Sequence, residues 1–256
     1  MRAIILSAGQ GKRLLPLTRE TPKCLLEVQD GISVLTYQLR TLAACGIREA
    51  SVIVGFGADQ VEEHLSAHPI AGLRVSACYN PFYALSDNLA TVWLSRGEMT
   101  GDFLLMNGDT LFEEDVLRTL LASPDAPLTL SINVKDRYDD DDMKVSLSGT
   151  RLTAVGKTLR REVVHGESIG LMYFRGAGVA AFRTALEGAI REPEALKLWY
   201  LSVVNGLTDS LDVATADISG FWWGEVDSPE DLEQVRKALR DRSRPGTQRS
   251  ASSRIE

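Results

Sequence analysis

Cysteine and histidine are scarce in this chain. It has three of each among 256 residues, with no C-x-x-C pair and no cluster of histidines. This scatter excludes a structural zinc site of the usual spacing. The odd number of cysteines, at positions 24, 45 and 78 in apolar or strand-like stretches, favours reduced and buried thiols. We therefore expect a cytoplasmic protein.

Long apolar runs and an excess of positive charge are also missing. No apolar run is long enough to span a bilayer, and a strand pattern begins where a signal peptide would stand. The formal net charge is −7 at pH 7, which argues against a nucleic-acid-binding surface, because such a surface needs clustered Lys and Arg. We predict neither a membrane partner nor a nucleic-acid partner.

Apolar runs and helical patterns alternate along the first half of the chain. Hydrophobic residues make up 44% of the sequence, enough for a chain of this length to bury a substantial core. The predicted strands cover residues 3–6, 51–54, 75–79, 103–106 and 128–134, and the predicted helices cover 34–45, 58–67, 88–99 and 113–121. This alternation predicts a three-layer αβα, Rossmann-like α/β fold with a mixed, mostly parallel sheet. Its chemistry would lie in loops at the carboxyl edge.

The pattern changes after residue 134. Close-set predicted strands at 143–147, 151–155 and 169–174, with a Ser-Gly turn after the first, indicate a small antiparallel insertion over the sheet edge. We place it at about residues 135–176. Helices at 177–191, 193–207 and 229–240, and strands at 213–217 and 221–226, complete one domain over residues 1–240. Residues 241–256 lack core-forming side chains and are predicted to be a disordered tail.

A loop rich in small residues follows the first predicted strand. Residues 7–11 read Ser-Ala-Gly-Gln-Gly and lead into Lys12 and Arg13, and Lys23 follows ten residues later. Backbone N–H groups beside cations suit a polyphosphate, because glycine lets the main chain approach closely. The loop matches neither G-x-G-x-x-G nor the Walker motif, since Leu14 replaces a glycine and no Ser or Thr follows Lys12. A turn that carries a surface Lys-Arg pair is the alternative.

Two aspartates directly follow predicted strands. Asp109 comes after Asn107-Gly108, and Asp227 precedes Ser-Pro-Glu at the start of a predicted helix. Two carboxylates at one sheet edge could hold Mg²⁺ between phosphate oxygens. The residues alone leave alternatives open, since Asp109 could be a turn residue and Asp227 a helix N-cap.

These segments resemble the signature of the nucleotidyltransferases that join a nucleoside triphosphate to a phosphorylated small molecule. That family carries Ala-Gly-x-Gly-x-Arg-Leu-x-Pro-Leu-Thr after the first strand and then Pro-Lys, and residues 8–18 and 22–23 match both. It also carries Gly-Asp after a central strand and Asp-Ser-Pro-Glu-Asp-Leu near the end, matched here at 108–109 and 227–232. The resemblance implies a nucleotidyltransferase domain over residues 1–240.

The resemblance assigns roles to individual residues. The catalytic residues would be Arg13, Lys23, Asp109 and Asp227, the last two as ligands of Mg²⁺. The nucleotide would contact Ala8, Gly9, Gly11, Lys12, Arg13, Lys23 and Asn88. Asn88 could equally cap a helix. An acceptor oxyanion is already nucleophilic, so positioning and charge neutralisation suffice for it to attack the α-phosphorus in line and expel pyrophosphate.

The donor and the acceptor follow from weaker similarities. Residues 79–89, which begin Tyr-Asn, and residues 198–200 look like the corresponding segments of phosphocholine-type cytidylyltransferases. The resemblance thus favours CTP as donor and a small phosphorylated alcohol or phosphonate as acceptor. The Gln-Pro, Gly-Thr-Ala and Glu-Lys-Pro elements of sugar-1-phosphate enzymes are absent. A sugar-1-phosphate nucleotidyltransferase that uses UTP, GTP or dTTP is the alternative.

The acceptor would contact Lys144, Lys157, Glu167, Gly170, Trp199 and Trp223. The two lysines would face the acceptor phosphate, and the tryptophans could attract a quaternary ammonium group or simply belong to the core. Glu167 could equally lie in an exposed loop. Four consecutive aspartates at 139–142 would form a solvated loop or face an amine-bearing acceptor.

Two other function classes stay open at this stage. A catalytically inactive, nucleotide-binding regulatory subunit would not need both metal carboxylates. A nucleotide-sugar glycosyltransferase would need an Asp-x-Asp motif at a strand end, and residues 139–142 offer that spacing only beyond the central strand. The sequence leaves the oligomeric state open.

Overall fold

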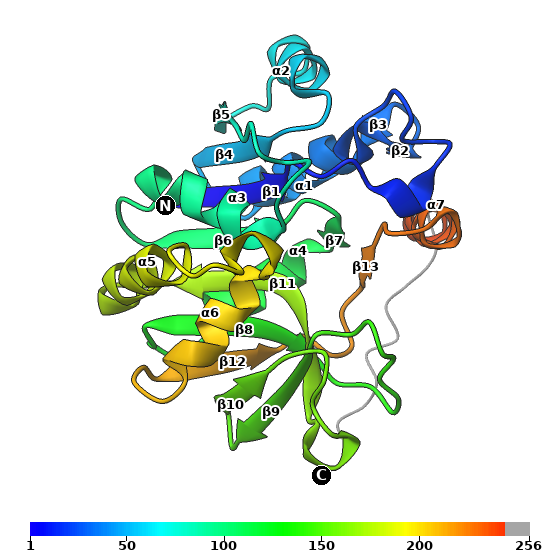
Figure 1. The fold of residues 1–256 in the computed structure, drawn as a ribbon. Helices are drawn as coiled ribbons and strands as arrows, with labels where there is room; N and C mark the ends of the chain where they lie inside the picture. Colours follow the sequence, from blue (N-terminus) through cyan, green and yellow to red (C-terminus); the bar gives the residue numbers. More distant parts are fainter. Residues whose placement is uncertain (244–256) are drawn as a thin grey trace.

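The computed structural model describes residues 1–243. Its centre is one nine-stranded mixed sheet (Figure 1). In spatial order the strands are β5 (Arg74–Tyr79), β4 (Glu49–Val54), β1 (Arg2–Ser7), β6 (Phe103–Asn107), β11 (Gly166–Phe174), β8 (Leu128–Asn133), β12 (Val213–Asp217), β10 (Arg151–Val155) and β9 (Lys144–Ser148). The strands from β5 to β6 are parallel, whereas β11 is antiparallel to both β6 and β8.

The prediction of a mostly parallel sheet is wrong. Of the eight neighbouring strand pairs in the described sheet, four are antiparallel, because β11, β10 and β9 each run against their neighbours. The β12–β8 pair is parallel, as are the pairs that β1 makes with β4 and β6. The fold is therefore a mixed α/β fold, parallel on the side of the N-terminal loop and largely antiparallel on the other.

Side chains of the central strands alternate between two cores. Along β1, Ala3 and Ile5 join one core and Ile4 joins the other; along β6, Leu104 and Phe103 divide in the same way. Alternate residues of a strand point to opposite faces, so a strand that is apolar throughout must be covered on both faces. This explains why the N-terminal strands read as continuous apolar runs.

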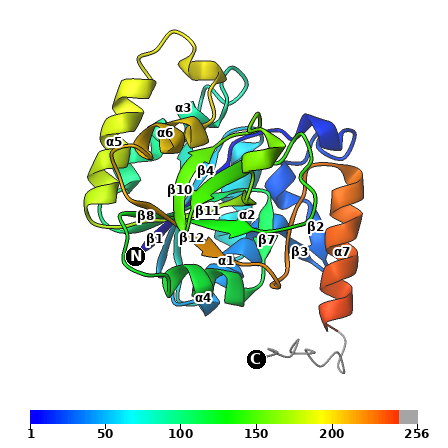
Figure 2. The same cartoon turned by 90° about the horizontal axis from the view of Figure 1, so that it is seen from below.

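Helices supply the cover on each face (Figure 2). On one face lie α3 (Asn88–Leu94), α5 (Ala177–Ala189) and α6 (Tyr200–Leu207). The other core receives side chains from α1 (Val34–Ala44), α2 (Ala58–Ala67) and α4 (Glu114–Leu121). None of the helices formed by residues 1–243 is long and apolar enough to cross a membrane.

A third, smaller core joins the two ends of the described chain. The hairpin of β2 (Glu27–Gln29) and β3 (Ile32–Ser33) meets α7 (Pro229–Ser243), and the Arg236 guanidinium donates to the Glu27 carbonyl oxygen at 2.8 Å. The buried members are Leu14, Leu26, Val28, Val34, Leu111, Val226, Leu232, Val235 and Leu239. Beside it, β13 (Trp223–Glu225) pairs antiparallel with β7 (Thr110–Phe112). This core holds the N-terminal loop against the segment that contains Asp227.

Three further predictions need correction. Residues 135–176 are not an insertion over the sheet edge, because their last strand, β11, lies inside the sheet between β6 and β8, where it is buried on both faces. The predicted helix 193–207 is a short turn, Ala195–Lys197, followed by α6, since Trp199 is extended. The predicted tail begins too early, because α7 continues to Ser243; the remaining tail residues, 244–256, lie outside the described residues.

Candidate active site

The loop after β1 is shaped by glycines and by one buried threonine. Gly11 has φ +71°, and a Cβ on it would lie 2.9 Å from the Lys23 side chain. The Thr18 hydroxyl donates to the Gly11 carbonyl oxygen at 2.8 Å and folds the segment back on itself. Only glycine accepts this backbone at low cost, so the sequence brings Lys23 directly over the loop.

The end of β6 lies beside this loop. Because β1 and β6 pair in parallel, with Leu6 opposite Asn107, both strands end at the same edge. A Cβ on Gly108 would lie 2.4 Å from the Leu6 carbonyl oxygen. The close approach turns the chain after Asn107 and delivers Asp109 to the loop, as the sequence predicts.

All four predicted catalytic residues meet in one charged centre. The Lys23 Nζ lies 2.7 Å from Asp109 Oδ2 and 2.5 Å from Asp227 Oδ1. Arg13 approaches the other oxygen of Asp227 at 2.7 Å. The Lys23 side chain is only 12% exposed, whereas that of Arg13 is 63% exposed. Lys23 is therefore a largely buried bridge between the carboxylates, whereas Arg13 pairs with Asp227 from the solvent side.

The charges of this centre shift one another's pKa values. Burial lowers the pKa of Lys23, but the Asp109 and Asp227 carboxylates outweigh it and leave that pKa above its ordinary value. Burial raises the pKa of Asp227, and Lys23 with Arg13 brings it below the ordinary value. Burial, Asp109 and Asp227 together raise the pKa of Glu225 to about 8. The centre thus keeps Lys23 charged and Asp227 ionised at neutral pH.

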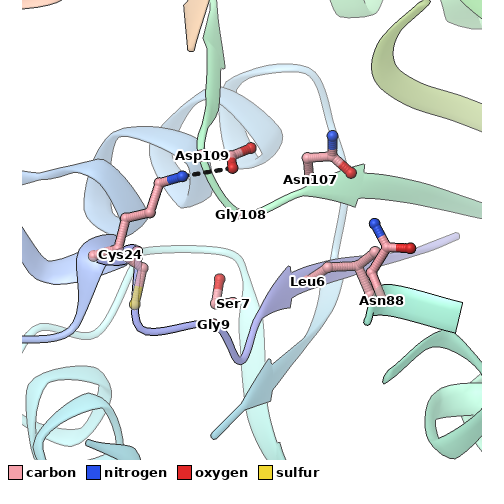
Figure 3. Close-up of a pocket in the computed structure, with 10 residues that line it drawn as sticks. Leu6, Ser7, Gly9, Cys24, Asn88, Asn107, Gly108 and Asp109 are labelled. Atoms are coloured by element: carbon pink, nitrogen blue, oxygen red, sulfur yellow. Dashed lines mark hydrogen bonds and ion pairs between the residues drawn. The ribbon is translucent and has the colours of Figure 1, made fainter. Parts of the chain in front are cut away.

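A cavity of about 210 Å³ opens beside the loop (Figure 3). Its lining residues are Leu6, Ser7, Gly9, Gly11, Lys23, Cys24, Asn88, Asn107, Gly108 and Asp109. Four predicted nucleotide contacts, Gly9, Gly11, Lys23 and Asn88, are among them. Ala8, Lys12 and Arg13 are not. The Ala8 carbonyl oxygen accepts from the Phe56 N–H at 3.0 Å, Lys12 is exposed, and Arg13 lines the second cavity described below.

A second cavity of about 360 Å³ adjoins the charged centre. Of the predicted acceptor contacts, it is lined by Lys157, Glu167, Gly170, Trp199 and Trp223. Lys144 does not join them. Its buried Nζ donates to the Lys157 carbonyl oxygen at 3.0 Å and to the Asp140 carbonyl oxygen at 3.5 Å. Lys144 thus ties two loops together behind the cavity.

Acidic side chains dominate the wall of this second cavity. The Lys135 Nζ lies 2.7 Å from both Asp142 Oδ2 and Glu167 Oε2, and Asn133 donates to Glu167 Oε1 at 3.0 Å. Glu167 is therefore a buried, paired carboxyl group and not an exposed loop residue; burial raises its pKa despite these partners. Asp141 lies 3.5 Å from the Lys157 Nζ. The acidic run at 139–142 does reach the site through its last two members.

The carboxylate pair fits a magnesium ion. Asp109 Oδ1 is buried and has no hydrogen-bond partner among the described residues, so it is an orphaned acceptor beside Asp227. Within residues 1–243 there is no group of three or more His, Cys, Asp or Glu that could hold a metal ion. Mg²⁺ suits such a site, because it is commonly bound by one or two carboxylates and completes its octahedron with water and phosphate oxygens.

Three residues of the site escaped the sequence analysis. Asn107 and Glu225 stand two residues before the aspartates, and Lys135 follows β8. The Asn-Gly-Asp and Glu-Val-Asp triplets carried a usable signal for the first two, because each places a polar side chain at the last residue of a strand, two positions before the aspartate. Lys135 carried none, since its partners come from two later segments.

The sequence of this chain is similar to those of several known proteins. The chain is 30% identical over 244 residues to CMP-5'-(3-aminopropyl)phosphonate synthase of Streptomyces rubellomurinus, covering 92% of this chain and 38% of that protein. It is 24% identical to the choline-phosphate cytidylyltransferase of Streptococcus pneumoniae, covering 94% and 99%. A bifunctional IPC transferase and DIPP synthase of Aquifex aeolicus is 27% identical, covering 93% and 51%. The chain thus spans about half or less of two of these relatives.

Solved structures share the fold. The inositol-1-phosphate CTP transferase from T. maritima superposes with a TM-score of 0.76 at 21% identity, covering 94% of this chain and 96% of that one. The family model described as "Nucleotidyl transferase" matches residues 2–137, a segment that contains the N-terminal loop and Asp109. Because this match covers more than half of its length, the chain belongs to the nucleotidyl transferase family.

Proposed function

We propose that this protein transfers CMP from CTP to a small phosphorylated alcohol or phosphonate and releases pyrophosphate in a Mg²⁺-dependent reaction. The observation that carries the proposal is the charged centre itself: Lys23 bridges Asp109 and Asp227 where the two cavities adjoin. One cavity has the glycine loop and the Lys23 cation, which suit a triphosphate. The other has room and charge for a second substrate. The names of the cytidylyltransferase relatives support CTP as the donor.

The residues of the centre divide the work of an in-line displacement. The backbone of Gly9 and Gly11 lies open to the triphosphate, and the exposed Arg13 pairs with the departing β- and γ-phosphates. Lys23 stabilises the negative charge that grows on the α-phosphate. Because the acceptor phosphate is already an oxyanion, no side chain has to remove a proton.

Asp109 and Asp227 would hold the magnesium ion. When bound, Mg²⁺ supplies Lewis-acid polarisation of phosphoryl oxygens and a fixed template for two anionic substrates. The two carboxylates would orient the ion, and Lys23 between them limits how much negative charge the free centre carries.

The acceptor pocket favours a substrate that carries an amine. Outside the charged centre, its charged lining consists of Lys135, Lys157, Asp141, Asp142, Glu167 and Glu225. The four acidic side chains outnumber the two lysines. The negative charges still outnumber the positive ones at neutral pH if Glu225 is protonated. Trp199 already holds a cation, since the Lys157 Nζ lies 4.4 Å from its ring centre. Phosphonates and phosphate esters with an ammonium group match this combination.

Pyrophosphate release in the presence of Mg²⁺ tests the proposal. CTP, UTP, GTP, ATP and dTTP are each combined with phosphocholine, phosphoethanolamine, aminoethylphosphonate, inositol phosphate and glucose-1-phosphate. We expect turnover with CTP and an amine-bearing acceptor, lost in Asp109→Asn and retained in Asp209→Asn, an exposed aspartate that lines neither cavity. Turnover confined to glucose-1-phosphate with UTP, GTP or dTTP would establish the sugar-phosphate alternative. Nucleotide binding without turnover would indicate a regulatory subunit.

A further inference from the structure

Three residues line both cavities: Asn88, Asn107 and Asp109. The α-phosphate of the nucleotide and the phosphate of the acceptor must meet where the cavities adjoin. Any polar group at this junction therefore faces the reacting phosphoryl groups. Asp109 belongs to the charged centre. Of the two neutral amides, Asn88 is a predicted nucleotide contact whose partner atom is unassigned, and Asn107 has no assigned role.

Both amides are held by one residue, Tyr200. Its backbone N–H donates to Asn88 Oδ1 at 2.9 Å, and its phenol donates to Asn107 Oδ1 at 3.1 Å. A backbone N–H can only donate, so the Asn88 oxygen must face it and the Asn88 nitrogen must point elsewhere. Tyr200 is fully buried, and burial with nearby Asp109 and Glu225 keeps its pKa far above the ordinary value. The phenol therefore stays protonated and continues to donate.

The amide nitrogens are left without a protein partner among the described residues. Neither Nδ2 donates to a protein acceptor in the part of the chain that the structure describes. A Cβ on Gly170 would lie 2.1 Å from Asn107 Nδ2, so this nitrogen lies directly over Gly170 on the acceptor wall. In Figure 3 the Asn88 and Asn107 amides lie on the same side of Gly108, away from Cys24.

We propose that Asn88 and Asn107 are phosphoryl-binding residues whose Nδ2 groups donate to non-bridging oxygens of the α-phosphate and of the acceptor phosphate or phosphonate. Tyr200 is their positioning residue. The inference rests on the proposed function and adds neutral donors to its cations. Donors whose orientation is fixed before the substrate binds need no reorganisation as charge develops, which makes them effective in the transition state. Gly170, at φ +71°, leaves the space that the Asn107 amide needs.

A double-mutant cycle tests the arrangement. Asn107→Ala should lower kcat about 100-fold, the usual effect of removing one oxyanion donor, and Asn107→Asp should lower it further because it replaces donors with acceptors. Tyr200→Phe should lower kcat about 10-fold, yet have no effect in the Asn107→Ala background, since its hydroxyl acts through that amide. A merely structural Tyr200 would give additive losses and a lower Tm. Tyr173→Phe, which removes a phenol hydroxyl outside both cavities, is the control.

Calorimetric titration with CTP separates this inference from the proposed function. If the wild-type protein turns over and Asn88→Ala and Asn107→Ala change neither kcat nor CTP affinity by more than about threefold, far below the usual donor effect, the inference is overturned and the function stands. If no pair of substrates reacts, the function fails and CTP affinity decides. At least about tenfold weaker binding by Asn88→Ala supports the inference. Unchanged binding, or no binding by the wild type, overturns it.

Discussion

Replacing Lys23 with methionine removes the cation from between two carboxylates and keeps the length of the side chain. Lys23 is 12% exposed and contacts Asp109 and Asp227, which are 27% and 29% exposed. Removing one partner of a buried ion pair costs about 3–5 kcal/mol, and the partial exposure of the carboxylates places this site near about 3 kcal/mol. For a domain of this size, we expect Tm to fall by about 6–12 °C.

Magnesium should reverse part of this loss. In Lys23→Met the two carboxylates repel each other until a cation binds, so Mg²⁺ should raise the Tm of the variant more than that of the wild type. Thermal unfolding followed by fluorescence, with and without Mg²⁺, measures both effects. Turnover should fall more than CTP affinity, because the Lys23 contact strengthens as charge grows on the α-phosphate.

Lys12→Met is the matched control, since Lys12 is an exposed lysine of the same loop. It should leave Tm within about 2 °C of the wild type, as surface substitutions usually do. A Lys23→Met variant that is as stable as this control without Mg²⁺ would refute the reasoning. So would an equal effect of Mg²⁺ on variant and wild type, because the carboxylate pair would then not be the site that the ion occupies.

Three further changes have definite expected outcomes. Gly170→Ala should lower kcat at least about tenfold, since its Cβ would displace the Asn107 amide. Lys144→Met should raise the acceptor KM and leave CTP affinity unchanged, because the lost contact to the Lys157 carbonyl loosens only the acceptor wall. His64→Gln should lessen the fall in Tm on acidification. Burial and the neighbouring His68 lower the pKa of His64 in the folded protein, so folding favours its neutral form. The stability that this provides is present above about pH 6.5 and is lost as the pH falls through the folded-state pKa.

Each of these outcomes has its own control. Gly149→Ala also places alanine at a positive φ, +61°, but meets no atom within 4 Å, so it should preserve kcat. Lys197→Met alters an exposed lysine and should leave the acceptor KM unchanged. Steady-state kinetics measures kcat and the acceptor KM of each variant, of its control and of the wild type. The first two predictions would be contradicted if variant and control behaved alike. For His64→Gln, a pH dependence of Tm identical to that of the wild type would contradict the third.

The sequence predicts the backbone turns that aim the residues of the charged centre, because those turns are local. Gly11 and Gly108 fix tight backbone approaches, the end of β6 carries Asp109 to the N-terminal loop, and Lys23 begins a short turn beside Gly11. The continuous apolar runs of β1, β4 and β6 reveal their burial for the same reason. Such features depend on residues close in sequence, so a pattern can report them.

The remaining features depend on partners that sequence spacing does not specify. The place of β11 inside the sheet is set by its pairing with β6 and β8, which come from distant segments. Lys144 is a cation of the kind that binds anions, but its Nζ donates to two backbone carbonyl oxygens. A pattern of side chains cannot indicate such backbone partners. The strands β7 and β13 have three residues each and are too short to show a period.

The third core gives the active site its own stability, separate from that of the sheet. It is small, it joins the two ends of the described chain, and it packs α7 and the Asp227 segment against the N-terminal loop. Small cooperative units of this kind open more readily than central strands, and their amide protons exchange together at a lower free energy. Opening this unit would part Asp227 from Arg13 and Lys23 while β1 and β6 stay paired. Two different equilibria therefore act in this molecule. Local opening of the third core decides whether the active site is assembled, and global unfolding decides whether the sheet is intact.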